Sequence, residues 1–376
     1  MKKCILVLCL LTAFNALAEE EIHTSGRDCG EDCFWSYDTT SHTLSITGSG
    51  KMTDYVSYDE QGNRIETPEN RPWNHLISEI ENVSVSGTTS IGALAFVNAN
   101  ALKNINISEG VTSIEYGALA FTGLTGIRIP DSVTSIGVSA FYNDTLLSDI
   151  SFGVNSNLQS IDRYAFSQNA LTNFNTPESL IFIGRGAFES VENLVNITIN
   201  DGTEIGRAAF TGTKMMENIV IGENCILDEN AFYGTSAAIY CPEALGCEDK
   251  GSENIIPYSI DKSGALKVGD DYYATAQDLA NGTKCVGGLT DDCITSALNR
   301  KISKLVSKGK YCSTVEECQA LVYADYHGEI LKIGQKSYQS LKDLMSGNYI
   351  PKRIYTIEEA ERVSTKTGNT FKLRYK

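Results

Sequence analysis

The 376-residue chain contains little histidine and has no excess of basic residues. Its four histidines, His23, His42, His75 and His327, stand in four different settings, and no two have the spacing of metal ligands on one helix. Lysine and arginine number 31 against 47 acidic residues, which gives a formal net charge of −16. Because nucleic-acid phosphates require a basic surface, this balance argues against nucleic acid as a partner.

Long apolar runs are missing from most of the chain. After the first residues no segment approaches the roughly 20 apolar residues that cross a bilayer, so no transmembrane segment is expected. The chain begins with two lysines, an apolar stretch that ends at Phe14 and the small-x-small pattern Ala16-Leu17-Ala18. This order is typical of a cleaved signal peptide, so we expect residues 1–18 to direct the protein to the cell surface or the medium. Acylation of Cys9 is the weaker alternative.

No arrangement of side chains typical of catalysis is found. The segment Gly48-Ser49-Gly50-Lys51-Met52 resembles a phosphate-binding loop, but Met52 stands where a serine or threonine would bind magnesium. The doublets Asp270-Asp271 and Asp291-Asp292 lack the spacing of a calcium loop and are expected in polar turns. We therefore expect no catalytic residue, no metal site and no cofactor. A hydrolase within residues 243–376 is the less favoured alternative.

Cysteines are present in near-neighbour pairs. Beyond the expected signal peptide, eight of the nine cysteines form the pairs Cys29/Cys33, Cys241/Cys247, Cys285/Cys293 and Cys312/Cys318. Because the chain is expected to be exported, we predict disulfide bonds within these pairs. None of the spacings fits the C-x2-C pattern of a zinc site. The ninth, Cys225, stands two residues before apolar Leu227 and is expected to be a buried free thiol.

The strongest pattern is an internal repeat between about residues 76 and 242. The dipeptide Ala-Phe recurs seven times, with its phenylalanines at Phe96, Phe121, Phe141, Phe166, Phe188, Phe210 and Phe232. Five residues before each phenylalanine stands an aliphatic residue or tyrosine, namely Ile91, Tyr116, Ile136, Ile161, Ile183, Ile205 and Leu227. A unit of this length cannot bury its own apolar side and must stack on its neighbours. We therefore expect residues 76–242 to form a solenoid of seven repeats, with the phenylalanines stacked as a core ladder.

Each repeat also contains a short alternating segment such as Asn104-Ile105-Asn106-Ile107. In a strand of this kind the isoleucines point to one face, and the residue between them points to the other. The residues between the inward pairs are Asn106, Arg128, Ser151, Asn175, Thr198 and Val220. Their outward neighbours include Asn104, Asp149, Asn173, Asn196 and Asn218. Most are short, polar and uncharged, which suits hydrogen bonds to a glycan or an extended peptide. The open alternative is that they only solvate an exposed sheet.

Two strings within the repeats identify a family resemblance. VTSIGVSAF (133–141) and IRIPDSVTSIG (127–137) resemble the consensus of BspA-like leucine-rich-repeat surface proteins. Residues 29–55, followed by Arg71-Pro72-Trp73, are similar to the N-terminal region of that family. The resemblance implies a right-handed α/β solenoid, a surface or secreted location, and a role in adhesion or protein binding. Residues 19–75 are then expected to be a β-rich cap that closes the first repeat.

The C-terminal part, residues 243–376, lacks the repeat. LKVGDDYYATAQDLANG (266–282) matches LKIGQKSYQSLKDLMSG (331–347) at seven of seventeen positions, and each copy predicts a strand, a turn and a short helix ended by glycine. Helices are also expected over 290–308 and 313–321, the second with a capping box. A basic segment from Pro351 onward is expected to contain a further helix and a strand at 371–375. A small disulfide-bearing α/β region results.

Together these patterns predict an exported, non-enzymatic binding protein. Its expected partner is an extracellular protein or glycan, bound through the sheet face of the solenoid. The alternative is a structural envelope protein that docks to a surface component through residues 243–376.

Overall fold

The computed structural model describes residues 24–247, 250–308, 311, 312, 314–329, 331–333 and 336–345. The expected signal peptide, the basic C-terminal segment and the strand expected at 371–375 lie outside these residues. By its internal contacts the chain divides into two compact units, Met1–Ile256 and Pro257–Lys376, which are described separately below.

The first unit begins with an antiparallel β-sheet that joins the solenoid. Strands β1 (Ser25–Gly26), β2 (Cys33–Asp38) and β3 (Thr43–Gly48) pair in antiparallel order, and β3 then pairs in parallel with β6 (Asn82–Ser86). Side chains along β2 are alternately buried and exposed, as expected for a strand with one face on the core. The cap also holds a hairpin, β4 (Val56–Tyr58) and β5 (Arg64–Glu66), and two short 3-10 turns, η1 (Pro68–Asn70) and η2 (Asn74–Leu76).

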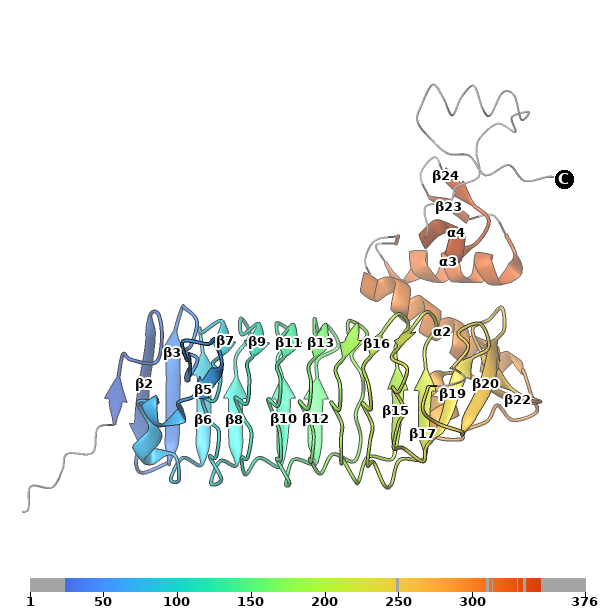
Figure 1. Cartoon of the computed structure of the whole chain (residues 1–376). Coiled ribbons are helices and arrows are strands. Elements are labelled where there is room, and N and C mark those ends of the chain that lie inside the picture. Colours follow the sequence, from blue (N-terminus) through green and yellow to red (C-terminus); the bar gives the residue numbers. More distant parts are fainter. Residues whose placement is uncertain are drawn as a thin grey trace, which may run out of the picture. The chain divides into compact units, whose positions relative to one another are not determined.

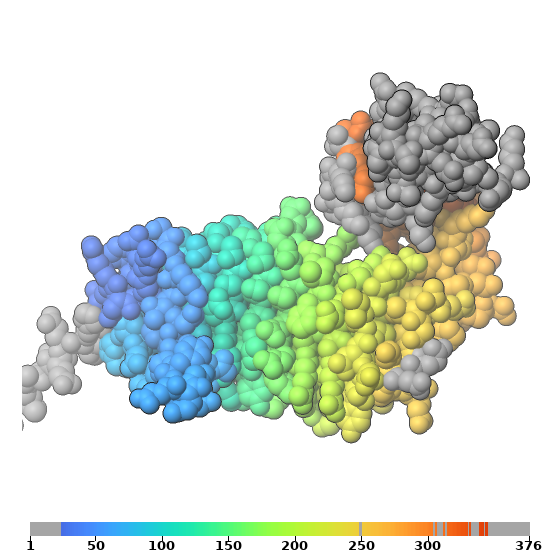
Figure 2. Space-filling view, turned by 45° about the horizontal axis from the view of Figure 1, so that its top comes forward, coloured from blue at the N-terminus to red at the C-terminus, as the bar shows by residue number. Residues whose placement is uncertain are grey.

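The repeats follow one another along two rows of parallel strands (Figure 1). The longer strands are β6, β8 (Asn104–Ile107), β10 (Gly126–Ile129), β12 (Asp149–Phe152), β15 (Asn196–Ile199), β17 (Asn218–Ile221) and β19 (Ala238–Pro242). The two-residue strands are β7 (Ser90–Ile91), β9 (Ser113–Ile114), β11 (Ser135–Ile136), β13 (Ser160–Ile161), β14 (Phe182–Ile183), β16 (Glu204–Ile205) and β18 (Ile226–Leu227). Figure 2 shows the successive repeats as neighbouring bands of colour, and the expected solenoid is confirmed.

A column of aromatic rings fills the centre of the solenoid. Six of the seven repeat phenylalanines are fully buried, namely Phe96, Phe141, Phe166, Phe188, Phe210 and Phe232. From Phe141 to Phe210 successive rings are stacked with centroids 5.2 to 5.6 Å apart. Trp73 of the cap stacks on Phe96 at 5.8 Å, so the cap continues the apolar column of the repeats. The predicted phenylalanine ladder is correct at these six positions.

At the remaining repeat phenylalanine, Phe121, the prediction of a buried core ring is wrong. Phe121 is 38% exposed, whereas Leu119 is fully buried and takes the core position of the second repeat. The strand register explains the difference, because Ile91 and Ile136 both pair with Ile114, not with Tyr116. The five-residue interval of this repeat therefore runs from Ile114 to Leu119, and the Ala-Phe dipeptide stands two residues later.

Glycine after the core isoleucine allows adjacent repeats to approach each other closely. A Cβ on Gly184 would lie 2.7 Å from the backbone of Asp162 and Arg163 in the preceding repeat. Neither Gly184 nor the equivalent Gly206 has a positive φ. Close approach, not the left-handed conformation, is thus the reason for glycine here.

The second unit contains the divergent duplication. Its elements are β20 (Ile255–Ile260, which begins before the unit boundary), β21 (Leu266–Val268), β22 (Asp271–Tyr273), α1 (Ala276–Ala280), α2 (Asp291–Lys308), α3 (Val315–His327), β23 (Leu331–Ile333), β24 (Lys336–Tyr338) and α4 (Leu341–Met345). Each copy is an antiparallel hairpin followed by a short helix, so the structure adds a second strand to the predicted strand, turn and helix. No helix of the described residues is both long enough and apolar enough to span a membrane.

The two copies bury equivalent side chains. Each copy buries a leucine of the first strand, a tyrosine of the second and a leucine of the helix, namely Leu266, Tyr273 and Leu279 in one copy and Leu331, Tyr338 and Leu344 in the other. The helices also begin alike: the hydroxyl of Thr275 accepts a hydrogen bond from the Asp278 N–H at 3.0 Å, and Ser340 accepts one from the Asp343 N–H at 3.1 Å. Such caps satisfy backbone donors that have no partner within the helix.

Candidate functional site

Four of the predicted sheet-face residues form an exposed polar row. Asn106, Arg128, Ser151 and Asn175 are exposed, and Thr198 is half-buried. The register places Arg128 beside Ser151. A bridge between Phe174 and Ile197 continues the same register, which puts Asn175 beside Thr198. The structure therefore brings five predicted residues into one row across consecutive repeats.

Val220 does not belong to this exposed row. It is 1% exposed, although it stands beside Thr198 in the register as expected. On its other side the register places Tyr240 of β19. A side chain without exposed surface cannot contact a ligand, so Val220 is removed from the candidate site.

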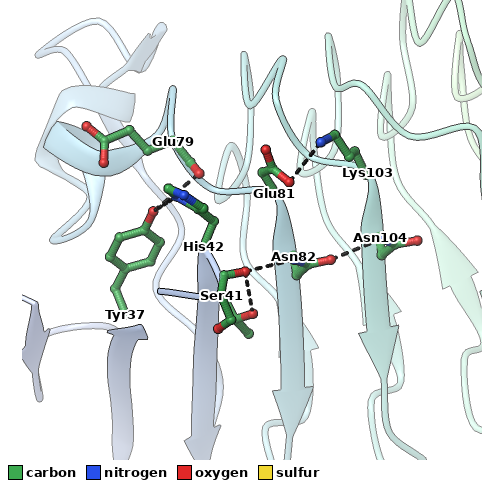
Figure 3. A network of polar contacts seen from close by, with 9 residues as sticks. Tyr37, Ser41, His42, Glu79, Glu81, Asn82, Lys103 and Asn104 are labelled. Atoms are coloured by element: carbon green, nitrogen blue, oxygen red, sulfur yellow. Dashed lines mark hydrogen bonds and ion pairs between the residues drawn. The ribbon is translucent and has the colours of Figure 1, made fainter. Parts of the chain in front are cut away.

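The outward asparagines at the start of the strands bind each other. The Asn104 Nδ2 donates to Asn82 Oδ1 at 3.0 Å, and Asn218 Nδ2 donates to Asn196 Oδ1 at the same distance. Figure 3 shows the first of these pairs, with Asn82 in turn donating to the Ser41 carbonyl at 3.1 Å. These amides bind one another across neighbouring strands and stabilise the sheet where its strands begin. The exposed polar row from Asn106 to Asn175 is therefore the better candidate for binding.

His42 and His75, the histidines of the first unit that the structure describes, have structural partners. His42, in the turn between β2 and β3, shares a 3.0 Å hydrogen bond with the Tyr37 hydroxyl (Figure 3). The ring of His75 lies edge-on to Trp35, with centroids 6.5 Å apart. Across the described residues no group of three or more histidine, cysteine or acidic side chains could hold a metal ion.

The segment that resembles a phosphate loop is part of the cap. Lys51 forms an ion pair with Asp54 at 2.8 Å, and Met52 is buried and pairs with Gly30 through a β-bridge. The lysine side chain is therefore engaged by a neighbouring carboxylate, and Met52 pairs with the segment between Cys29 and Cys33 that precedes β2.

All four predicted cysteine pairs are bonded in the structure. The bonds join Cys29 to Cys33, Cys241 to Cys247, Cys285 to Cys293 and Cys312 to Cys318. The last two tie the first turns of α2 and α3 to the chain that precedes them. Cys225 is 5% exposed, and burial raises the pKa of its thiol to about 11. Since the thiolate is the reactive form, Cys225 has the properties of a core residue.

A second surface feature was not predicted from the sequence. A groove of about 470 Å³ lies along the turns that follow the short strands. Its lining includes four aromatic side chains and two carboxylates, namely Tyr116, Phe121, Tyr142, Tyr164, Glu66 and Glu189. The register of the second repeat would have predicted this groove. Because Leu119 occupies the core position, Phe121 faces outward.

The backbone of each turn explains why large side chains line the groove. Phe121 and Tyr164 have φ values of 59° and 57°, in the left-handed region that disfavours residues other than glycine. In the fourth repeat, left-handed residues stand on both sides of the buried Ala165-Phe166 pair, at Tyr164 and at Gln168. The core residues can therefore point inward while their neighbours point to the surface.

Contacts within the groove order its aromatic side chains. Phe121 and Tyr142 meet edge to face with centroids 5.5 Å apart, and the Gln168 Nε2 donates to the Tyr142 hydroxyl at 2.9 Å. At one end the Tyr116 hydroxyl donates to a carboxylate oxygen of Glu66. The groove thus offers a preformed surface of ring faces and carboxylates, a combination that is typical of binding sites.

Comparison with known proteins places the repeats in a family. The model of the BspA type leucine rich repeat region matches residues 76–157 and 122–239, in six copies. A leucine rich cell surface protein from Faecalibacterium prausnitzii is similar in structure, with a TM-score of 0.28 and 14% identity over 61% of this chain and 93% of that one. The pneumococcal vaccine antigen PcpA has a TM-score of 0.33 and 14% identity over 61% of this chain and 77% of that one.

One curated protein also has a local sequence similarity. Translation initiation factor 6 of Methanothermobacter thermautotrophicus is 29% identical over 132 residues. That stretch is 32% of this chain and spans only 57% of the length of the initiation factor.

Proposed function

We propose an extracellular binding function without catalysis for this chain, whose repeat region belongs to the BspA-type leucine-rich repeat family. Four disulfide bonds support a location in an oxidising compartment outside the cytosol. An expected signal peptide over residues 1–18 agrees with that location. Repeat solenoids present extended surfaces that bind partners, which supports the binding function.

The observation that carries the proposal is the polar row on the longer strands. Asn106, Arg128, Ser151 and Asn175 are exposed on consecutive repeats, at a strand spacing of about 4.8 Å. A glycan or an extended protein segment that crosses the strands meets one hydrogen-bonding side chain in each repeat. Each such bond contributes only about 0.5–1.5 kcal/mol, so affinity depends on the whole row.

The test combines three substitutions on the row. We expect the Asn106→Lys, Ser151→Lys and Asn175→Lys triple variant to fold normally, because all three side chains are exposed. Its binding to glycan arrays, and to extracellular proteins retained by the wild type, should weaken at least about tenfold, since three contacts of about 0.5–1.5 kcal/mol are removed.

A control triple variant adds the same charge elsewhere. Thr145→Lys, Asn155→Lys and Asn193→Lys change exposed residues of the same solenoid that lie outside the row. Wild-type binding is expected for this variant. Unchanged binding by the row variant, or an equal loss in both variants, would refute the proposed face.

A further inference from the structure

Tyr116 and Glu66 of the groove lining form one arrangement with the guanidinium of Arg64, which lies beside the lining. Arg64 of strand β5 lies over the ring of Tyr116, with its guanidinium carbon 3.4 Å from the ring centroid. The hydroxyl of the same tyrosine donates to Glu66, two residues further along the strand. A cation over a ring face is attracted by the ring quadrupole, and the nearby carboxylate adds to the attraction.

A second tyrosine and carboxylate stand together two repeats further along. If Gly186 had a Cβ, it would lie 2.6 Å from Tyr164 Cε1 and 3.1 Å from Glu189 Oε2. The Tyr164 ring and the Glu189 carboxylate thus both pack against Gly186. Gly186 has a φ of +60°, and the Tyr164 ring lies so close to it that a Cβ would clash, so glycine lets the ring and the carboxylate pack here. Among the described residues, no ion pair is formed by Glu189.

The charge of the groove favours a cation. Its lining contains the carboxylates Glu66 and Glu189 and neither lysine nor arginine, while Arg64 lies beside the lining, over Tyr116. The chain as a whole carries a formal charge of −16, which draws basic partners toward it. Between the two tyrosine–carboxylate pairs lie the rings of Phe121 and Tyr142, which offer apolar contact to an extended chain.

We propose that the groove binds an arginine side chain of a partner polypeptide at Tyr164 and Glu189. The chain's own Arg64 at Tyr116 and Glu66 shows the geometry that this arginine adopts. Arginine fits better than lysine because its planar guanidinium stacks on a ring face and donates two parallel hydrogen bonds to a carboxylate. This site shares no residue with the polar row on the longer strands, so it goes beyond the function proposed above.

The experiment uses the full chain and a defined peptide. Fluorescence anisotropy measures the dissociation constant for a labelled (Gly-Ser-Arg)3 peptide and for the same peptide with citrulline, which keeps the shape but removes the charge. We expect the arginine peptide to bind at least about tenfold more tightly than the citrulline peptide. Glu189→Gln and Tyr164→Leu should each weaken the arginine peptide about fivefold or more.

Matched variants separate this site from general charge attraction. Glu204→Gln removes an exposed carboxylate and Tyr233→Leu an exposed tyrosine, both outside the groove lining. Both should leave the affinity within about twofold of wild type, because neither touches the site. Circular dichroism of every variant verifies the fold.

Three results would overturn the proposal. They are no binding of the arginine peptide, an equal loss in the control variants, and equally tight binding of (Gly-Ser-Lys)3. None of them bears on the polar row, whose own variants test the proposed function separately.

Discussion

Asp144 is the one fully buried carboxyl group among the described residues, and it lies inside the repeat stack. The Thr122 N–H and hydroxyl both donate to its Oδ1, whereas Oδ2 is buried without a partner. Burial outweighs these hydrogen bonds and raises the pKa of Asp144 to about 7. The folded pKa therefore exceeds the unfolded one, so the protein is more stable with Asp144 protonated, and stability falls as the pH rises from about 4 to about 7.

Asp144→Asn should remove this pH dependence. The neutral amide keeps the shape of the side chain, so we expect the variant to unfold at higher urea concentration than wild type at pH 8, where Asp144 is charged. The difference should shrink toward pH 5, with a wild-type slope of up to about 1.4 kcal/mol per pH unit. Asp149→Asn, at an exposed position, is the control and should follow wild type at every pH. Parallel curves for wild type and Asp144→Asn would contradict the assignment.

At the level of the repeat, one five-residue string takes two different positions relative to the core. The string Gly-Ala-Leu-Ala-Phe occurs at 92–96 and again at 117–121. In the first copy Leu94 and Phe96 are both buried, whereas in the second Leu119 is fully buried and Phe121 is 38% exposed. The preceding strand determines which residue of the string is buried in the core. Ile91 and Ile114 are paired, and the core position lies five residues after each of them.

Stability measurements can verify this register. We expect Leu119→Ala to cost about 2–5 kcal/mol of unfolding free energy, because it opens a cavity in the buried stack. Phe121→Ala should cost about 1 kcal/mol or less, since it removes a half-exposed ring that contacts Tyr142. Phe166→Ala provides a reference for full ring burial, at about 3–5 kcal/mol. Urea melts in which Phe121→Ala is more damaging than Leu119→Ala would show that the register is wrong.

The sequence predicted the repeats well because a solenoid is defined by local periodicity. The spacing of isoleucine and phenylalanine was sufficient to place six of seven core rings and the exposed row from Asn106 to Asn175. It could not place the groove, because exposure there depends on left-handed turns such as Tyr164 and on packing between repeats. Burial of Val220 likewise depends on contacts between strands, which the alternation of one strand does not contain.

For the whole molecule, the structure predicts the number of reactive thiols. Four disulfides leave Cys225 as the free cysteine of the described residues, and it is buried. If residues 1–18 are removed on export, alkylation of the unreduced chain should label no thiol in buffer and one in denaturant. Each bond closes a loop of a few residues and should contribute about 2–3 kcal/mol. Mass spectra with free thiols at Cys285 and Cys293, or at Cys312 and Cys318, would contradict the pairing.

The position of Trp73 has a consequence for spectroscopy. The chain has only two tryptophans, and both Trp35 and Trp73 lie in the cap, where they are buried and contact each other edge to face. Intrinsic tryptophan emission therefore reports on one end of the solenoid, while far-ultraviolet circular dichroism averages over all the repeats. Since each repeat contacts only its neighbours, the two signals need not change together in denaturant. The difference between the urea midpoints of the two signals shows whether the cap and the repeats unfold as one cooperative block or separately.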